Sequence, residues 1–548
     1  MLANTQDTEL ICIANTRLAI VLAEHLDDLG GARGALTQVL ALKPDDRETL
    51  LLLTDYHARA QDVEAATEGA RQLLRVSTGR EERLGTIIHL FRVELTLGRR
   101  EQAREVLLNA VLLEGPDGLA ADEYRAFVRD DEDWERYEDA LLKFLRQSEQ
   151  DGEPLVPTYL ALAEVQAAEL GTIDRAINTL EMGLANVGES EPLRVELGRW
   201  LRAEGRLPDA IRVYQKLLKE HPASASGWRG LYESYVAAKR GAEATLTLAP
   251  LCILGEASEH EARVMQSASP RPPVGSAGIL HPDNYRSLVD RNDQGAVAER
   301  LLSIIDYSLA RLYPLDLESY GVSSRDRITN RSNDPLRKLA DRVAQIFAVP
   351  DFEMYMIRTQ GTRVKLDFGT TPALLIPASV LRLNETQQVF VLARALADVA
   401  RGLHPLNKFK AQDLMLILAA AARASNPNYG STLADGSALN ELNRRIIKAL
   451  PRKERKACED VAAAYASAPP IDFAAWVQGN TMSATRVGAL VAGDLVLCVE
   501  VLRHEDSALS YVEGADMVDT SPVIADLLRY WCSDSAHELR RHLGKRGV

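Results

Sequence analysis

The sequence predicts a mainly α-helical protein in two parts: an N-terminal α-solenoid of helical hairpins, followed by an α+β domain with a small β-hairpin or sheet. Two observations carry this prediction. Glycines and alanines recur at fixed spacings through the first half, as in an array of repeated helix pairs. One stretch alone, residues 353–377, has the composition and alternation of β-strands. At 548 residues the chain can form several domains, since one core seldom serves more than about 250 residues.

The repeated feature of the first half is a glycine followed five residues later by an alanine. The pairs are Gly98 and Ala103, Gly171 and Ala176, and Gly205 and Ala210. Gly171 and Gly205 lie 34 residues apart, the length of one tetratricopeptide repeat, which residues 205–222 resemble. Small residues let two helices cross closely, and Pro44 and Pro222 end second helices. The pattern is clear near 11–44, 80–116, 156–188 and 193–222, and degenerate near 46–79 and 117–150.

A segment rich in Pro, Gly and Ser, residues 266–278, is the clearest boundary in the chain. We therefore interpret residues 1–262 as a tetratricopeptide-like domain, 263–280 as a linker, and 281–548 as the second domain.

The second domain has its own order of elements. We predict a helical stretch from His281-Pro282, helices at 296–312 and 336–348, strands at 353–359, 363–368 and 373–377, and a helix at 385–401. The first two strands are expected to form a hairpin that turns near Gln360-Gly361. Asn384 is a good N-cap for the last helix, because Gln387 can return a hydrogen bond to it.

Residues 389–404 have the apolar frame of a zinc-binding helix without its ligands. This segment resembles the His-Glu-x-x-His signature of gluzincin-type zinc peptidases of the M48 class, with Arg394 and Asp398 at the histidine positions and Ala395 at the glutamate position. Downstream, residues 481–494 resemble the helix that supplies the third ligand, with Thr481 in place of its glutamate and Thr485 in place of its aspartate. The combination also resembles bacterial proteins in which tetratricopeptide repeats precede a peptidase-like domain. The resemblance implies a metallopeptidase-like fold.

The substituted residues predict a pseudo-enzyme that holds no zinc, metal or other cofactor. Zinc requires imidazole, thiolate or carboxylate ligands and a general base for its water, whereas a guanidinium stays protonated. Asp398 alone would be a weak metal site. Arg394 and Asp398, four residues apart, either form an ion pair in the space of the lost metal or are both solvated.

Other candidate motifs favour ordinary structural roles. His537 and His542 are five residues apart, so on a helix they point about 140° apart and we expect a charged C-terminal helix. His404 precedes Pro405 and is expected to mark a helix end rather than a relic ligand. The basic residues between Arg444 and Lys456 are expected to form a solvated helix surface rather than a docking patch.

Composition narrows the classes of partner. A formal charge of -14 and a pI near 5.4 argue against nucleic acid, which requires a basic face. No stretch approaches the roughly 20 apolar residues of a membrane span, and Asp7 and Glu9 have the wrong sign for a secretory signal. Five scattered cysteines indicate reduced core thiols, so we expect a cytoplasmic protein.

We therefore expect a non-catalytic scaffold or adaptor. The repeat solenoid would bind a partner protein, or else serve mainly as a cradle for the second domain. The pseudo-peptidase domain would provide a second binding platform. Two alternatives remain at this stage: a hydrolase with an unrecognised active site, and a subunit of a large hetero-assembly with both grooves buried. Oligomeric state and the partner-binding residues are not predicted.

Overall fold

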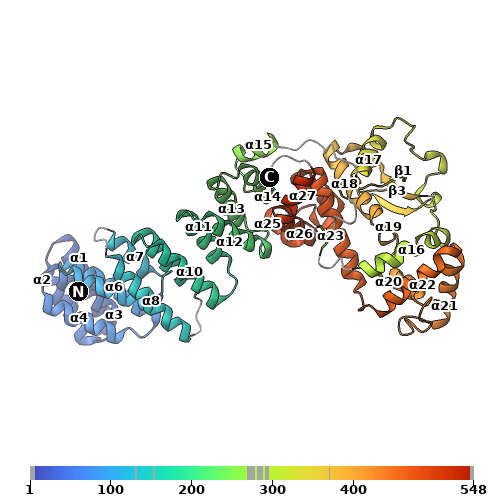
Figure 1. Ribbon diagram of the computed structural model, residues 1–548. Helices are drawn as coiled ribbons and strands as arrows, with labels where there is room; N and C mark the ends of the chain where they lie inside the picture. Colours follow the sequence, from blue (N-terminus) through green and yellow to red (C-terminus); the bar gives the residue numbers. More distant parts are fainter. Residues whose placement is uncertain are drawn as a thin grey trace. The chain divides into compact units, whose positions relative to one another are not determined.

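The computed structural model describes residues 7–129, 133–151, 155–267, 278–280, 288–290, 295–369 and 371–543. The chain divides into two compact units, residues 1–206 and 207–548 (Figure 1). Most of the predicted linker and the helical stretch predicted from His281 lie outside the described residues.

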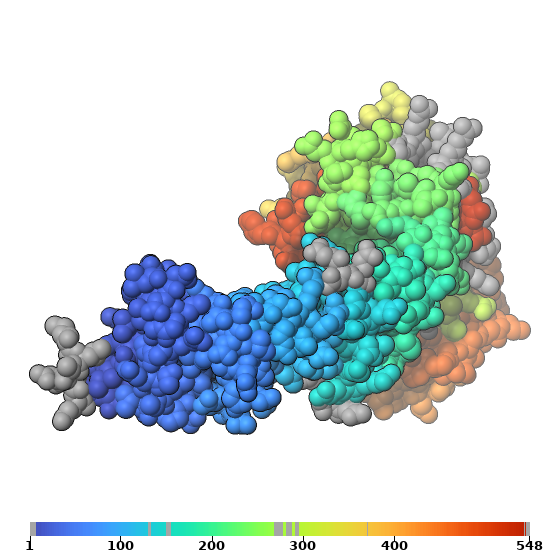
Figure 2. All heavy atoms as spheres, turned by 90° about the vertical axis from the view of Figure 1, so that its left-hand side faces the viewer, coloured from blue at the N-terminus to red at the C-terminus, as the bar shows by residue number. Residues whose placement is uncertain are grey.

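The first unit is a tetratricopeptide-like array of helices. They are α1 (Thr8–His25), α2 (Leu29–Leu42), α3 (Arg47–Arg59), α4 (Val63–Val76), α5 (Arg80–Thr96), α6 (Arg100–Glu114), α7 (Leu119–Val128), α8 (Trp134–Asp151), α9 (Val156–Glu164), α10 (Ile173–Val187) and α11 (Glu191–Ala203), with a π-helical turn at Val165–Glu169. Successive helices lie beside one another in sequence order (Figure 2). The described part of the chain contains no helix long and apolar enough to cross a membrane.

The repeated small residues occupy the positions that the sequence predicts. Ala32, Ala103 and Ala176 are fully buried, and Gly98 and Gly171 adopt positive φ between helices. A larger side chain at the alanines would separate the helices, and left-handed backbone favours glycine. The two degenerate segments nevertheless fold as helices: α3 packs on α4, whereas α7 and α8 both pack on α6. Aromatic stacking replaces the missing pattern in the second of them, where the rings of Tyr124 and Tyr137 lie 5.1 Å apart.

The second unit begins with helices from the repeat region: α12 (Leu207–Glu220), α13 (Ala225–Ala237), α14 (Gly241–Leu254) and α15 (Glu259–Ser267). These helices pack against the C-terminal end of the chain. Trp531 Nε1 donates a hydrogen bond to the Leu246 carbonyl (3.1 Å), and Arg529 Nε donates to the Lys219 carbonyl (2.8 Å). The compact second unit therefore contains helices that the repeat pattern assigns to the first domain.

The remaining elements of the second unit follow in chain order. They are α16 (Ala296–Leu312), α17 (Pro335–Ile346), β1 (Glu353–Ile357), β2 (Lys365–Phe368), β3 (Pro372–Pro377), α18 (Glu385–Ala400), α19 (His404–Lys408), α20 (Ala411–Ala422), α21 (Gly436–Ala449), α22 (Arg452–Ser467), α23 (Phe473–Ala492), α24 (Leu495–Glu505), α25 (Gly514–Thr520), α26 (Pro522–Trp531) and α27 (Asp534–His542). Helices α16, α20, α21 and α22 enclose one apolar core, which Trp476 of α23 also enters (Figure 1).

The sheet has the order β1-β3-β2, so the predicted hairpin between the first two strands is wrong. β3 is the central strand and pairs parallel with β1 and antiparallel with β2. The physical reason lies in β3, whose residues from Ala373 to Pro377 are all buried, as expected of an inner strand. The antiparallel pair is therefore β2 with β3, and β2 is left at one edge of the sheet.

Candidate functional site

Helix α18 begins as the sequence predicts. The Asn384 side chain accepts from the Gln387 backbone N–H (3.0 Å), and the Gln387 side chain returns a hydrogen bond, forming a capping box. Along its length α18 packs closely on α23. Gly488 permits this approach, because a Cβ there would lie 2.7 Å from Cγ of Arg394.

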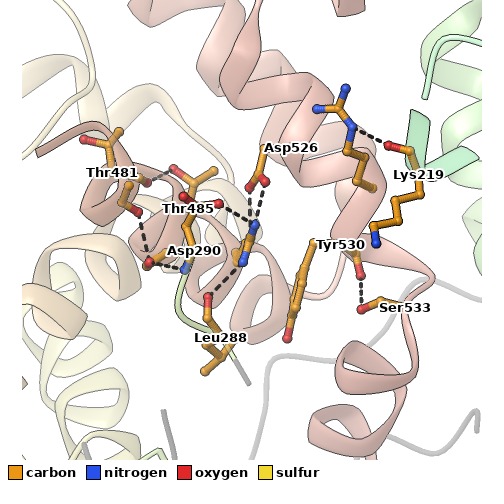
Figure 3. Close-up of polar contacts among 12 residues, drawn as sticks. Lys219, Leu288, Asp290, Thr481, Thr485, Asp526, Tyr530 and Ser533 are labelled. Atoms are coloured by element: carbon orange, nitrogen blue, oxygen red, sulfur yellow. Dashed lines mark hydrogen bonds and ion pairs between the residues drawn. The ribbon is translucent and has the colours of Figure 1, made fainter. Parts of the chain in front are cut away.

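Four of the five residues singled out by the zinc-peptidase resemblance line one small cavity between these helices. Arg394, Ala395, Asp398 and Thr481 surround a volume of about 40 Å³, enough for a water molecule or two. Thr485 is buried away from it, and its hydroxyl donates to the Thr481 carbonyl at 2.7 Å (Figure 3). Packing of α18 on α23 thus places Thr481 beside Asp398, which lies 83 positions earlier in the sequence.

Arg394 is neither solvated nor paired with Asp398, so both expectations for this pair are wrong. Its Nη1 lies 2.9 Å from Oε2 of Glu505 at the end of α24, and both side chains are about nine-tenths buried. The guanidinium also lies over the ring of Phe390, 5.2 Å from its centroid. A charge buried on a helix face needs a partner, and the fold supplies it from a helix more than 100 residues away.

Asp398 is buried and engaged by two side-chain amides. Asn407 Nδ2 donates to one carboxylate oxygen at 2.7 Å, and Asn480 Nδ2 donates to the other at 3.1 Å. Burial raises the pKa of Asp398 to about 6, although these hydrogen bonds and the charges of Arg401 and Arg363 oppose the rise. The carboxyl group therefore titrates close to neutral pH.

These residues do not fit a zinc ion. Among the five positions singled out by the resemblance, only Asp398 could supply an anionic ligand, and both of its oxygens already accept amide hydrogens. The cationic Arg394, one helical turn away, lines the same cavity. The hydroxyl of Thr481 donates to its own helix, at the Val477 carbonyl (3.0 Å). Within the described residues, no group of three or more His, Cys, Asp or Glu side chains is arranged to hold a metal.

A larger cleft of about 1020 Å³ shares Arg363, Val364, Arg394, Leu406, Asn407, Thr481 and Glu505 with the small cavity. Residues 360–367, which include the start of β2, form one wall. The opposite side comes from the ends of α19 and α24 and from the turn at residues 506–509. β2 pairs with β3 alone among the described strands, its residues 365–367 line the cleft, and α19 also packs on it.

Sequence reasoning missed several residues of this site. Glu505, Asn480, Asn407 and Arg363 line the cavity but belong to no recognisable motif. One signal was available: a buried arginine on an apolar helix requires a distant acid. Nothing in the sequence indicates which of the many acids it is.

Arg486 of α23, in the segment that resembles a third-ligand helix, has a structural role. Its guanidinium binds both oxygens of Asp526 (2.8 and 2.6 Å) and reaches Asp290 (2.9 Å) and the Leu288 carbonyl (3.3 Å) (Figure 3). The residue thereby attaches α26 and residues 288–290 to α23.

The remaining candidate motifs differ from metal sites. His537 lies in a C-terminal helix, α27, as predicted, and both His537 and Arg540 are buried there. Burial and then the Arg540 charge lower the pKa of His537 to about 4. His404 opens the short helix α19, with Nε2 2.8 Å from the Asp306 carboxylate. The basic side chains between Arg444 and Lys456 are exposed, as expected of a solvated surface.

No family model matches the chain, and no curated protein matches it. Among solved structures, the chain is similar to a thermophilic TPR protein of Thermus thermophilus (21% identity, covering 41% of this chain and 99% of that chain, TM-score 0.16). It is also similar to BtubC from P. vanneervenii (16%, 48% and 92%, TM-score 0.19) and to a chain of the Naa15/Naa10 complex bound to HypK-THB (13%, 93% and 70%, TM-score 0.28). We draw no functional conclusion from likenesses at this level; the repeat architecture rests on the helices described above.

Proposed function

We propose that this chain is a non-catalytic protein-interaction scaffold. The cleft of the second unit holds an extended segment of a partner protein without cleaving it, and the helical-repeat unit binds a partner protein. One observation carries the proposal: a cleft of about 1020 Å³ runs beside an edge strand, with an arginine, an alanine, a hydrogen-bonded aspartate and a threonine at the positions where the sequence resemblance would place zinc chemistry.

An extended peptide suits this cleft because the part of β2 before Phe368 has no second strand beside it. At Phe368 the backbone groups are already bonded, the N–H to Asp367 Oδ1 (2.7 Å) and the carbonyl to the Leu315 N–H (3.0 Å). Peptides commonly bind by adding a strand to such an edge, so that main-chain hydrogen bonds give affinity and side-chain pockets give specificity. The apolar wall residues Leu366, Leu406 and Leu502 and the polar residues Thr362 and Ser507 supply both kinds of surface.

The pseudo-peptidase interpretation belongs to the same proposal. A sheet strand followed by α18, and α23 packed on α18, is the order that the sequence resemblance implies, and it supports a common origin with such enzymes. The residues now present replace metal-binding chemistry by an ion pair and an amide-bound carboxyl group.

A partner for the repeat unit is supported by its first helix. Leu10, Ile13, Leu18, Ile20 and Val21 of α1 are 38–54% exposed, while its opposite face packs on α2. A helix that is apolar on both faces is normally covered. Contiguous exposed apolar surface of this kind marks interaction sites.

The cleft can be tested with a blocking variant. Thr481→Trp should fill the floor of the cleft and abolish capture of partner proteins from native lysate, whereas Lys456→Trp on the exposed face of α22 should not. Elemental analysis of the wild-type protein should find no stoichiometric zinc, and incubation with unfolded casein should release no peptides. One tightly held zinc per chain, or casein cleavage lost in Thr481→Trp, would refute the non-catalytic scaffold.

A hydrolase remains the second candidate because of one observation. An aspartate whose pKa is near 6, lining the same cavity as a second carboxylate, Glu505, is typical of acid–base sites. Hydrolysis of a peptide, ester or glycoside substrate that Asp398→Asn abolishes, with folding unchanged, would favour this function. The engagement of both Asp398 oxygens by amides and of Glu505 by Arg394 favours the scaffold.

A further inference from the structure

Two cations lie at the edge strand without a direct ion pair in the described part of the chain. Arg363, two residues before β2, and Lys365, the first residue of β2, both line the cleft and are both exposed. In the described chain neither forms an ion pair; Lys365 Nζ only lies 5.6 Å from the ring centroid of Tyr320. Two positive charges therefore face the space in which the proposed peptide would lie.

The acids of the same cleft are engaged elsewhere. They are Asp316, Asp367, Glu505 and Asp506. Asp367 pairs with Lys408, and Glu505 with Arg394. Asp316 and Asp506 accept backbone N–H groups of their own turns, from Ser319 (3.3 Å) and Ala508 (2.9 Å). None of these carboxylates forms an ion pair with Arg363 or Lys365.

Arg363 is also close to a second guanidinium. Partial loss of solvent and the neighbouring charge of Arg394 lower the pKa of Arg363, and the charges of Glu505 and Asp398 oppose this without reversing it. The guanidinium remains protonated at neutral pH. Arg394 already uses Glu505, and Asp398 is bound by two amides. An additional carboxylate at Arg363 would relieve this repulsion and could be bound through two parallel N–H···O hydrogen bonds.

We propose that the cleft selects peptides that carry a carboxylate, which Arg363 binds with Lys365 beside it. This inference rests on the proposed function, since it specifies the class of peptide that the same cleft holds. The carboxylate can come from an Asp or Glu side chain or from a free peptide C-terminus. The contrasting explanation is that cations on β2 only discourage edge-to-edge aggregation, a common use of charge on edge strands.

Two peptide-display libraries distinguish these explanations. Both present random dodecapeptides, one with free C-termini and one with the peptide inside a longer chain, and both are selected on the full-length protein. We expect enrichment of Asp or Glu at one position, or enrichment in the free-terminus library alone. Fluorescence anisotropy on an enriched peptide should then show about 10- to 100-fold weaker binding when its carboxylate is converted to an amide, as expected for a charge-assisted hydrogen bond.

Protein variants give the matched comparison. Arg363→Gln with Lys365→Gln should remove the preference for the carboxylate over the amide peptide, whereas Lys453→Gln with Lys456→Gln, two exposed cations of α22, should retain it. All four side chains are exposed, so circular dichroism should show unchanged folding. Enriched peptides that bind equally well as amides, or an unchanged preference in the β2 variant, would overturn the inference while leaving peptide binding intact. Failure of both libraries to enrich any peptide would overturn the proposed function itself.

Discussion

Replacing Glu505 by Gln should destabilise the second unit strongly, because it leaves Arg394 buried without its partner. The two side chains are 12% and 10% exposed and their charged atoms lie 2.9 Å apart. Removing one member of a buried ion pair typically costs about 3–5 kcal/mol, since the other charge stays desolvated. The apolar double variant Arg394→Met with Glu505→Leu should recover most of this loss, because it removes both desolvation costs.

Urea unfolding followed by tryptophan fluorescence measures the effect, since the second unit contains the buried residues Trp228, Trp476 and Trp531. Glu441→Gln is the matched control. Its pair with Arg444 is shorter, at 2.6 Å, but the side chains are 56% and 73% exposed, so its loss should cost less than about 1 kcal/mol. Equal effects of Glu505→Gln and Glu441→Gln, or no recovery in the double variant, would refute the reasoning from burial.

Three further outcomes are expected. The pKa of Asp398 rises from 3.8 to about 6 on folding, so the free energy of unfolding falls by about 3 kcal/mol as pH rises between these values. In urea titrations at several pH values, Asp398→Asn should therefore gain stability relative to wild type across that range. The pKa of His537 falls from 6.5 to about 4 on folding, so stability is lost as pH falls between these values. His537→Leu should reduce the acid sensitivity of the thermal midpoint. An unchanged dependence of the midpoint on pH would contradict the burial of a neutral imidazole. In the repeat unit, Ala103→Leu should lower the free energy of unfolding by about 1–3 kcal/mol in calorimetry, because Ala103 is fully buried at a helix crossing. Ala41→Leu, at an exposed position of α2, should change it little. Similar values for both variants would refute the role of Ala103 at the crossing.

The helical elements of this chain could be predicted well from local signals. Helix 296–312 and the capping box at Asn384 follow from apolar periodicity and cap chemistry, which depend on residues a few positions apart. Strand pairing was predicted less well. Three adjacent strands allow several orders, and the choice depends on distant contacts, such as those of Ala373 and Leu375 with Leu315 and Leu317.

The candidate site shows the same limit more sharply. The positions of Arg394, Ala395, Asp398 and Thr481 around one cavity could be expected from two motif-like segments. Their partners could not, because ion pairs and amide hydrogen bonds join residues with no sequence relation, as Glu505 does with Arg394. The boundary between the compact units at residue 206 could not be predicted either. Sequence periodicity identifies helices α12 to α15 as part of the repeat pattern but does not show which part of the chain they pack against.

The packing of α14 under the C-terminal helices has a consequence during synthesis of the protein. The carbonyl of Leu246 and the indole of Trp531, which hydrogen-bond to each other, are 285 residues apart. A ribosome adding about 5–20 residues per second would need about 15–60 s to make the intervening chain. For most of that interval the part of α14 that packs on α24 and α25 has no native cover, although α13 already packs on the helix. Binding of a nascent-chain chaperone to α14 should therefore persist until these later helices emerge.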